Sequence, residues 1–245
     1  MFFFIKGLVS YTSGKRMITY GDVLRKVVHF LLIVSLAVPL YWRELAEIFF
    51  PPPYSPIMEV FVDPGSVYAL IVIGAALINA FRIKSPIAEE KLVEFRRKIT
   101  EVSPFGKKIE EIMEIMDSFV NAMQRDYERR AGYLGLVYGT VGVFIAYTLF
   151  GYEVIYGIAA LATTDIFSSL GGMTFGRKKL PFSNGTLEGT IIGFFSFLFP
   201  LLFVEPVNRA IILAAAASFV EAYGVEDNLS VPVFVSFISW IMRNM

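Results

Sequence analysis

Cysteine is absent from the 245 residues of this chain, and histidine occurs only once, at His29. The first absence excludes a disulfide-stapled fold, a thiol nucleophile and every cysteine-based metal or iron–sulfur site. The second excludes a histidine-rich metal centre. A surplus of positive charge is also lacking, because 22 Lys and Arg balance 22 Asp and Glu. We therefore expect no nucleic-acid partner, since such proteins carry a basic excess.

Charged residues make up only 18% of the sequence, whereas 56% of the residues are hydrophobic and the mean hydropathy is +0.61. Ordinary soluble domains contain about 25% charged residues. The apolar excess is collected in segments whose lengths are near the roughly 20 residues that a helix needs to cross a bilayer. These segments are Val27–Trp42, Pro64–Phe81, Ala131–Tyr152, Val154–Gly176, Gly189–Val204, Ala210–Val220 and Asn228–Met242. We expect an all-α polytopic membrane protein with about seven transmembrane helices, forming a single integral membrane domain over residues 1–245.

The basic residues alternate from one side of these segments to the other. Lysine and arginine are frequent before the first segment, between the second and third, and after the fourth, whereas the alternate loops hold only Arg43 and Arg209. The positive-inside rule then predicts a cytoplasmic N-terminus and a C-terminus on the outside. Residues 82–130 are expected to form a cytoplasmic helical hairpin, because Ser85-Pro86 and Ser103-Pro104 suit helix starts and apolar residues then recur at helical spacing.

Polar residues gather near the predicted cytoplasmic ends of several segments. The first segment begins with Arg25, Lys26 and His29, whose spacing places all three on one helix face. Asp165 interrupts the fourth apolar segment, and Glu221 follows the sixth. Charged groups near membrane depth are costly and usually mark a functional site. The alternative is structural, with the two cations as topology anchors and the carboxylates paired to nearby loop cations.

The loop after the fourth segment combines glycines with three consecutive cations, Arg177–Lys179. Glycines let backbone amides approach a phosphate, and the cations neutralise its charge. Gly171 and Gly176 have the spacing of a Walker A motif, but Arg177-Lys178 replaces its Lys-Ser/Thr pair and no strand precedes it, so a P-loop is excluded. Carboxylates suited to Mg²⁺ and cations suited to phosphate together predict phosphoryl or nucleotidyl transfer at a membrane surface.

Three blocks of the sequence resemble the family of dolichol kinases, phytol kinases and CTP-dependent diacylglycerol kinases, which is related to the phosphatidate cytidylyltransferases. Residues 25–29, Arg-Lys-Val-Val-His, resemble the family's Arg-Lys-x-x-His. Residues 165–193 resemble its Asp…Gly-Arg…Leu-Pro…Thr-x-Glu-Gly-Thr-x-x-Gly segment, and residues 221–232 resemble its closing Glu-Ala…Asp-Asp-Asn-Leu-x-x-Pro signature. One position departs from the pattern, because Gly185 stands where members commonly have a lysine.

The resemblance implies a compact prokaryotic enzyme that uses CTP and Mg²⁺ to phosphorylate a polyprenol- or dolichol-type isoprenoid alcohol. The reaction would take place at the cytoplasmic face of the plasma membrane, in a multi-pass protein. The alternatives are a cytidylyltransferase that makes a CDP-lipid, and, from a different class, a lipid or ion transporter. The expected partners are a lipid alcohol and the membrane, and homo-oligomerisation is left open.

The same resemblance implies roles for individual residues. Four carboxylates are implied to be catalytic, namely Asp165, Glu188, Glu221 and Asp227. Mg²⁺ would be held by Asp165, Asp227 and Glu221. The implied nucleotide-binding residues are Arg25, Lys26, His29, Gly176, Arg177, Lys178, Lys179, Thr186, Gly189 and Asn228.

Overall fold

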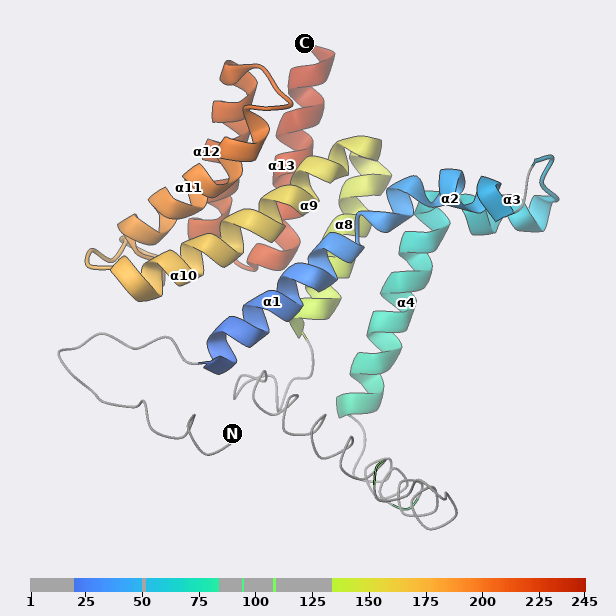
Figure 1. The fold of residues 1–245 in the computed structure, drawn as a ribbon, viewed down its shortest axis with the longest axis horizontal. Helices are drawn as coiled ribbons and strands as arrows, with labels where there is room; N and C mark the ends of the chain where they lie inside the picture. Colours follow the sequence, from blue (N-terminus) through green and yellow to red (C-terminus); the bar gives the residue numbers. More distant parts are fainter. Residues whose placement is uncertain (1–19, 50–51, 84–93, 95–107, 109–133) are drawn as a thin grey trace. The chain divides into compact units, whose positions relative to one another are not determined.

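The computed structural model describes residues 20–49, 52–83, 94, 108 and 134–245 (Figure 1). Within these ranges every secondary-structure element is a helix, and the one β-type pairing is an isolated bridge between Lys179 and Thr186. The all-α prediction is thus confirmed for the described residues. The predicted hairpin at 82–130 falls almost entirely outside them.

The chain divides into two compact units. One joins the residues up to Ala37 with those from Ile145 onward, and the other runs from Val38 to Phe144. The elements of the first unit are α1 (Tyr20–Ser35), η2 (Gly151–Glu153), α9 (Val154–Ala160), η3 (Leu161–Asp165), α10 (Ile166–Phe175), α11 (Leu187–Leu201), α12 (Val207–Tyr223) and α13 (Asp227–Asn244). Those of the second are η1 (Val38–Tyr41), α2 (Trp42–Phe49), α3 (Pro56–Val62) and α4 (Pro64–Ile83). Helix α8 (Leu134–Phe150) begins in the second unit and ends in the first.

Short helices of the second unit are held by polar contacts at their ends. The Ser55 hydroxyl caps α3 by accepting from the Met58 N–H at 3.3 Å. The Trp42 indole N–H donates to the Phe61 carbonyl at 3.0 Å, and this bond ties α2 to α3. Arg43 and Glu59 join the same two helices by a 2.8 Å ion pair. The first two contacts satisfy backbone groups that the ends of short helices leave without an intrahelical partner.

In the first unit, α10 packs on α11, α11 on α12, α12 on α13 and α13 on α9 (Figure 1). Glycines bring the first pair close together. A Cβ atom added at Gly189 of α11 would lie 2.6 Å from the Ser168 carbonyl oxygen of α10, and one at Gly193 would lie 3.0 Å from the Ser168 Cβ. Helices that contain small residues at their interface approach closely without any polar contact. The same glycines therefore fix where Ser168 lies.

A π-helical turn, η3, joins α9 to α10 and ends at Asp165. Such a turn contains one more residue than an α-helical turn, so it rotates the following side chains relative to the preceding helix. Four of its five residues are buried, including Asp165 itself. The interruption that the sequence shows at Asp165 is thus a change of helix type rather than a break.

Two stretches of the described residues are long and apolar enough to cross a membrane by length and composition, Val23–Phe49 and Leu134–Phe175. Shorter apolar helices occupy Pro64–Ala80 and Leu187–Leu201. The structure therefore supports two candidate membrane-spanning stretches. The count of seven stays a prediction.

Candidate functional site

Asp165 is the centre of a buried ionic cluster. The Lys26 ammonium donates to its two carboxylate oxygens at 3.0 and 2.9 Å, and the His29 Nε2 lies 3.3 Å from Oδ2. The Lys26 side chain is only 6% exposed and that of Asp165 only 10%. Isolated charges at such depth would be strongly unfavourable, so each of these two groups depends on the other.

Helix α1 turns its polar side inward. Lys26 and His29 are three residues apart, which places both on the face that meets η3. Val27, Phe30 and Leu31 are exposed on other faces of the same helix. This arrangement is the reverse of a water-soluble amphipathic helix and is typical of a helix in lipid. The sequence prediction that the basic residues share a face is confirmed for Lys26 and His29, while Arg25 is half-buried.

Ser168 connects Asp165 to Glu221. It lies one helical turn after Asp165, and its hydroxyl donates to the Glu221 Oε1 at 2.5 Å and lies 3.2 Å from the Asp165 carbonyl oxygen. Ser168 is buried, and Glu221 is half-buried on α12. The sequence motifs do not single out this serine. Its spacing of three residues from Asp165 on one helix was the signal that could have found it.

Asp227 begins α13 and brings a third carboxylate to the cluster. Its Oδ1 accepts the Asn228 N–H at 2.7 Å. Asp165, Asp227 and Lys26 all act electrostatically on Glu221, so these groups lie near one another although they come from separate elements. Of the three carboxylates, Asp165 contacts Lys26 and His29, whereas Glu221 and Asp227 lie nearby. The Asn228 Oδ1 is buried without a hydrogen-bond partner, as are five other side-chain atoms of the described residues.

A metal ion does not fit this arrangement as it stands. Within the described part of the chain, no group of three or more His, Asp and Glu side chains is placed to hold one. The Asp165 oxygens are taken by Lys26, and the Glu221 Oε1 is taken by Ser168. The predicted ligands Asp165, Glu221 and Asp227 are therefore brought to one region without forming a coordination shell. The Mg²⁺ site stays a prediction from the resemblance.

Glu188, the fourth predicted carboxylate, holds a loop together. Its carboxylate accepts the backbone N–H groups of Arg177 at 3.0 Å and Lys178 at 3.2 Å. These bonds, first that from Arg177, hold the pKa of Glu188 below its usual value of 4.5. Thr186 caps α11 by accepting the Gly189 N–H at 3.2 Å. The structure thus gives Thr186, Glu188 and Gly189 local roles in the loop and at the helix start.

The cations Arg177, Lys178 and Lys179 are exposed. The ten residues of α10 separate them from Asp165. Among the described residues, no hydrogen bond or ion pair joins their side chains to the Asp165 cluster. Gly176, also predicted to bind nucleotide, lies against Thr186, where an added Cβ would come 2.8 Å from the threonine methyl group. Nucleotide binding by these residues stays a prediction.

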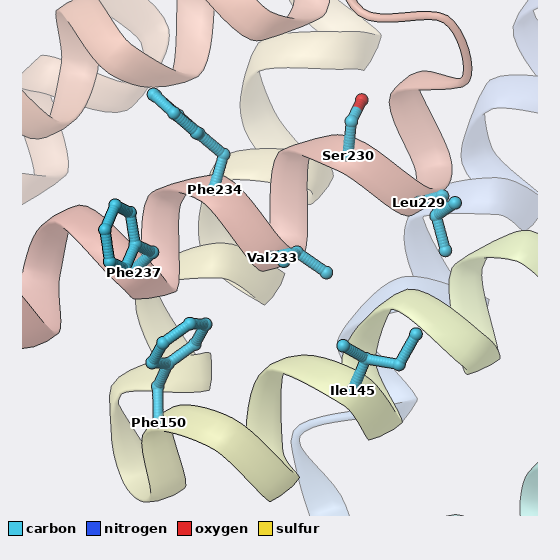
Figure 2. A pocket seen from close by; sticks show the side chains of 7 residues that line it. All are labelled: Ile145, Phe150, Leu229, Ser230, Val233, Phe234 and Phe237. Carbon is cyan, nitrogen blue, oxygen red and sulfur yellow. The ribbon is translucent and has the colours of Figure 1, made fainter.

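An open apolar groove of about 430 Å³ lies beside the N-terminal half of α13 (Figure 2). Figure 2 shows side chains of α13 on one side and two side chains of α8 on the other. Its lining residues are Ile145, Phe150, Leu229, Ser230, Val233, Phe234 and Phe237. The groove begins one residue after Asn228 and reaches the ring pair of Phe150 and Phe237, whose centroids are 5.7 Å apart.

A second ionic cluster, around Glu153, lies at the opposite ends of the helices. The buried Glu153 carboxylate accepts from Ser239 at 2.6 Å, from Arg209 at 3.2 Å and from Arg243. Arg209 also pairs with Glu205 at 3.1 Å. Two acidic and two basic side chains balance each other here. No sequence motif predicts this cluster, because Arg209 and Arg243 are 56 and 90 residues away from Glu153 in the sequence.

Comparisons of the chain with family models, with curated proteins and with solved structures found no match. The likeness to the CTP-dependent lipid kinases is therefore a likeness of three short blocks. The chemistry of the site rests on its own residues.

Proposed function

We propose that the chain is a membrane-embedded phosphotransferase that uses CTP to phosphorylate a polyprenol- or dolichol-type isoprenoid alcohol at the cytoplasmic face of a prokaryotic plasma membrane. The observation that carries the proposal is the buried Asp165 cluster, in which Lys26 and His29 contact Asp165 while Glu221 and Asp227 lie nearby on separate elements. Ionisable groups are costly to bury in an apolar bundle, and groups retained in this way usually serve a function.

The surface between the two ionic clusters supports a membrane setting. On α12 the exposed side chains include Ile211, Ile212 and Phe219, and on α13 they are Phe234, Phe237 and Trp240 up to Arg243. From Asp227 to Arg243, α13 rises about 24 Å at 1.5 Å per residue, which is close to the thickness of about 30 Å of a hydrocarbon core. An apolar belt of this height, bordered by charge at both ends, is what a bundle crossing a bilayer requires.

In the proposed reaction the alcohol oxygen attacks the γ-phosphorus of CTP, the bond to the CDP oxygen breaks, and a carboxylate accepts the alcohol proton. Glu221 suits the last role, because Ser168 fixes its Oε1 and leaves Oε2 as the acceptor. Lys26 places positive charge beside the transferred group, where charge-assisted bonds to phosphate oxygens are strongest, and the His29 ring lies next to it. Phosphoryl transfer needs such positioning and charge more than it needs a strong base.

The groove beside α13 supports a lipid as the acceptor. Its walls are apolar, and it begins next to Asn228, at the edge of the charged cluster. From Leu229 to Phe237 the helix rises about 12 Å. A lipid chain lying there would bring the attached hydroxyl group to the cluster.

The test is a product analysis with purified protein in detergent. CTP labelled at the α- or γ-phosphate, and ATP labelled in the same way, are incubated with isoprenoid alcohols, diradylglycerols and phospholipids. The proposal expects a labelled lipid monophosphate and CDP from an isoprenoid alcohol. A CDP-lipid with pyrophosphate would show a cytidylyltransferase instead. Absence of nucleotide consumption with every acceptor would contradict both.

A further inference from the structure

The loop from Arg177 to Thr186 presents an aromatic ring among cations. Phe182 at its tip is fully exposed, and Arg177, Lys178 and Lys179 are exposed on the segment that leads to it. No acidic residue occurs between Asp165 and Glu188. Phe175 and Leu187, at the ends of the flanking helices, are exposed as well. The loop therefore carries positive charge and apolar surface together.

Two backbone hydrogen bonds across the loop hold Phe182 in its exposed position. The Leu180 N–H donates to the Gly185 carbonyl at 3.1 Å, and the Leu187 N–H donates to the Lys178 carbonyl at 2.8 Å. Phe182 has a φ of 59°, in the left-handed region that aromatic residues rarely adopt. A backbone conformation of this kind persists only when the surrounding contacts enforce it. The bonds across the loop thus hold the ring outward.

We propose that this loop docks on an anionic lipid surface, with Phe182 inserted among the headgroups and Arg177, Lys178 and Lys179 paired with lipid phosphates. Charge complementarity favours this partner, because the loop has three cations and the cytoplasmic leaflet is negatively charged. Insertion removes an apolar ring from water, which is favourable in proportion to the area buried. The combination of basic residues with an exposed aromatic ring is typical of segments that bind at the interface. The proposal assigns these cations to lipid rather than to CTP, and it stands whether or not the chain transfers phosphate.

The absence of cysteine allows a direct test with one introduced label. Asn184→Cys, at an exposed position of the same loop, is labelled with an environment-sensitive fluorophore and placed in nanodiscs. The discs contain phosphatidylcholine alone or mixed with phosphatidylglycerol. We expect blue-shifted emission and quenching by spin-labelled lipid in the anionic discs, with the shift reduced by added salt. Phe182→Ser in this background should lose most of the shift, and so should Lys178→Glu with Lys179→Glu.

Val225→Cys is the matched control, because Val225 is also fully exposed on a loop but lies beside the acidic Glu226. Its label should report water in both kinds of disc. Water-like emission at both positions in anionic discs would overturn the proposal. An emission shift of the label at position 184 that responds to CTP and not to anionic lipid would also overturn the proposal. It would indicate that the cations bind the nucleotide. Thermal unfolding of each variant, matched to the parent, confirms that the fold is kept.

Discussion

Lys26 and Asp165 form a buried ion pair that should contribute to the stability of the fold and, in the proposed reaction, to turnover. Both side chains are almost fully buried, and the ammonium group contacts both carboxylate oxygens. Removing one member of a buried ion pair leaves the other charge without compensation, which typically costs about 3–5 kcal/mol. Replacing both members with apolar residues is often neutral. Stability and activity should therefore separate at this pair.

Asp165→Asn is expected to lower the free energy of unfolding by about 3–5 kcal/mol, because Lys26 then lies buried without a countercharge. The double variant Asp165→Leu with Lys26→Met should regain most of the thermal stability and still lack phosphotransfer. Thermal unfolding in detergent and the product assay measure the two effects separately. If the single variant melts with the parent protein, the ion pair does not support the fold.

Ser168→Ala should impair turnover by freeing the Glu221 carboxylate that the hydroxyl fixes at 2.5 Å. A hydrogen bond to a charged group contributes about 1.5–3 kcal/mol, so kcat should fall by more than about tenfold with a smaller change in KM. Ser236→Ala is the control, because the hydroxyl of this equally buried serine donates only to the Pro232 carbonyl of its own helix. Equal activity of both variants would remove Glu221 from the proposed reaction.

Glu188 should make the Arg177–Thr186 loop sensitive to acid. The pKa of Glu188 is lowered in the folded protein. Its stabilisation of the loop is therefore fully present at a pH above its ordinary pKa of 4.5, and is lost as the pH falls through the lower pKa of the folded state. We expect the Arg177 and Lys178 amides to exchange hydrogen faster, relative to their intrinsic rates, below pH 4.5. Glu188→Gln should show the faster exchange already at neutral pH, and a variant that exchanges like the parent would contradict this role.

Helices α10 and α11 depend on glycine for their close approach. Gly189→Ala would place a methyl group 2.6 Å from the Ser168 carbonyl oxygen, so the two helices must separate and Ser168 must shift. We expect lower thermal stability together with reduced turnover. Gly74→Ala in α4 is the control, because nothing lies within 4 Å of the added Cβ. Alanine is favoured over glycine in a helix by roughly 0.5–1 kcal/mol, so this variant should be at least as stable as the parent.

Helices were predictable from the sequence where their signal is local. The uncharged runs 64–81 and 189–204 correspond to α4 and most of α11, and the spacing of Lys26 and His29 placed both on one face. The π turn at Asp165 was not predictable, because the extra residue in the turn is decided by packing in three dimensions. Glu188 was assigned to catalysis from its motif, whereas its contacts with the Arg177 and Lys178 amides appear only in the folded loop.

The Glu153 cluster was hidden for a related reason. Glu153, Arg209 and Arg243 each border an apolar segment, where a charge normally marks only the end of the segment. Their mutual contacts arise when α9, α12 and α13 pack together. Within the first unit, one ionic cluster therefore lies at each end of the apolar belt. The Asp165 end has three carboxylates to one lysine and one histidine, whereas the Glu153 end has as many basic as acidic groups.

The loop cations Arg177–Lys179, and not the charge of the two clusters, predict which end faces the cytoplasm. The cationic loop containing Phe182 and the loop containing Val225 adjoin the Asp165 end, and Met245 follows the Glu153 end. Single cysteines introduced at these three exposed positions can be labelled with a membrane-impermeant maleimide in intact cells and in inverted vesicles. Positive charge favours the cytoplasmic side, so Phe182→Cys and Val225→Cys should react only in inverted vesicles and Met245→Cys only in intact cells. Detergent should make all three react, which controls for accessibility. Reaction of all three from the same side would show that α13 does not cross the bilayer, and the proposed membrane embedding would fall with it.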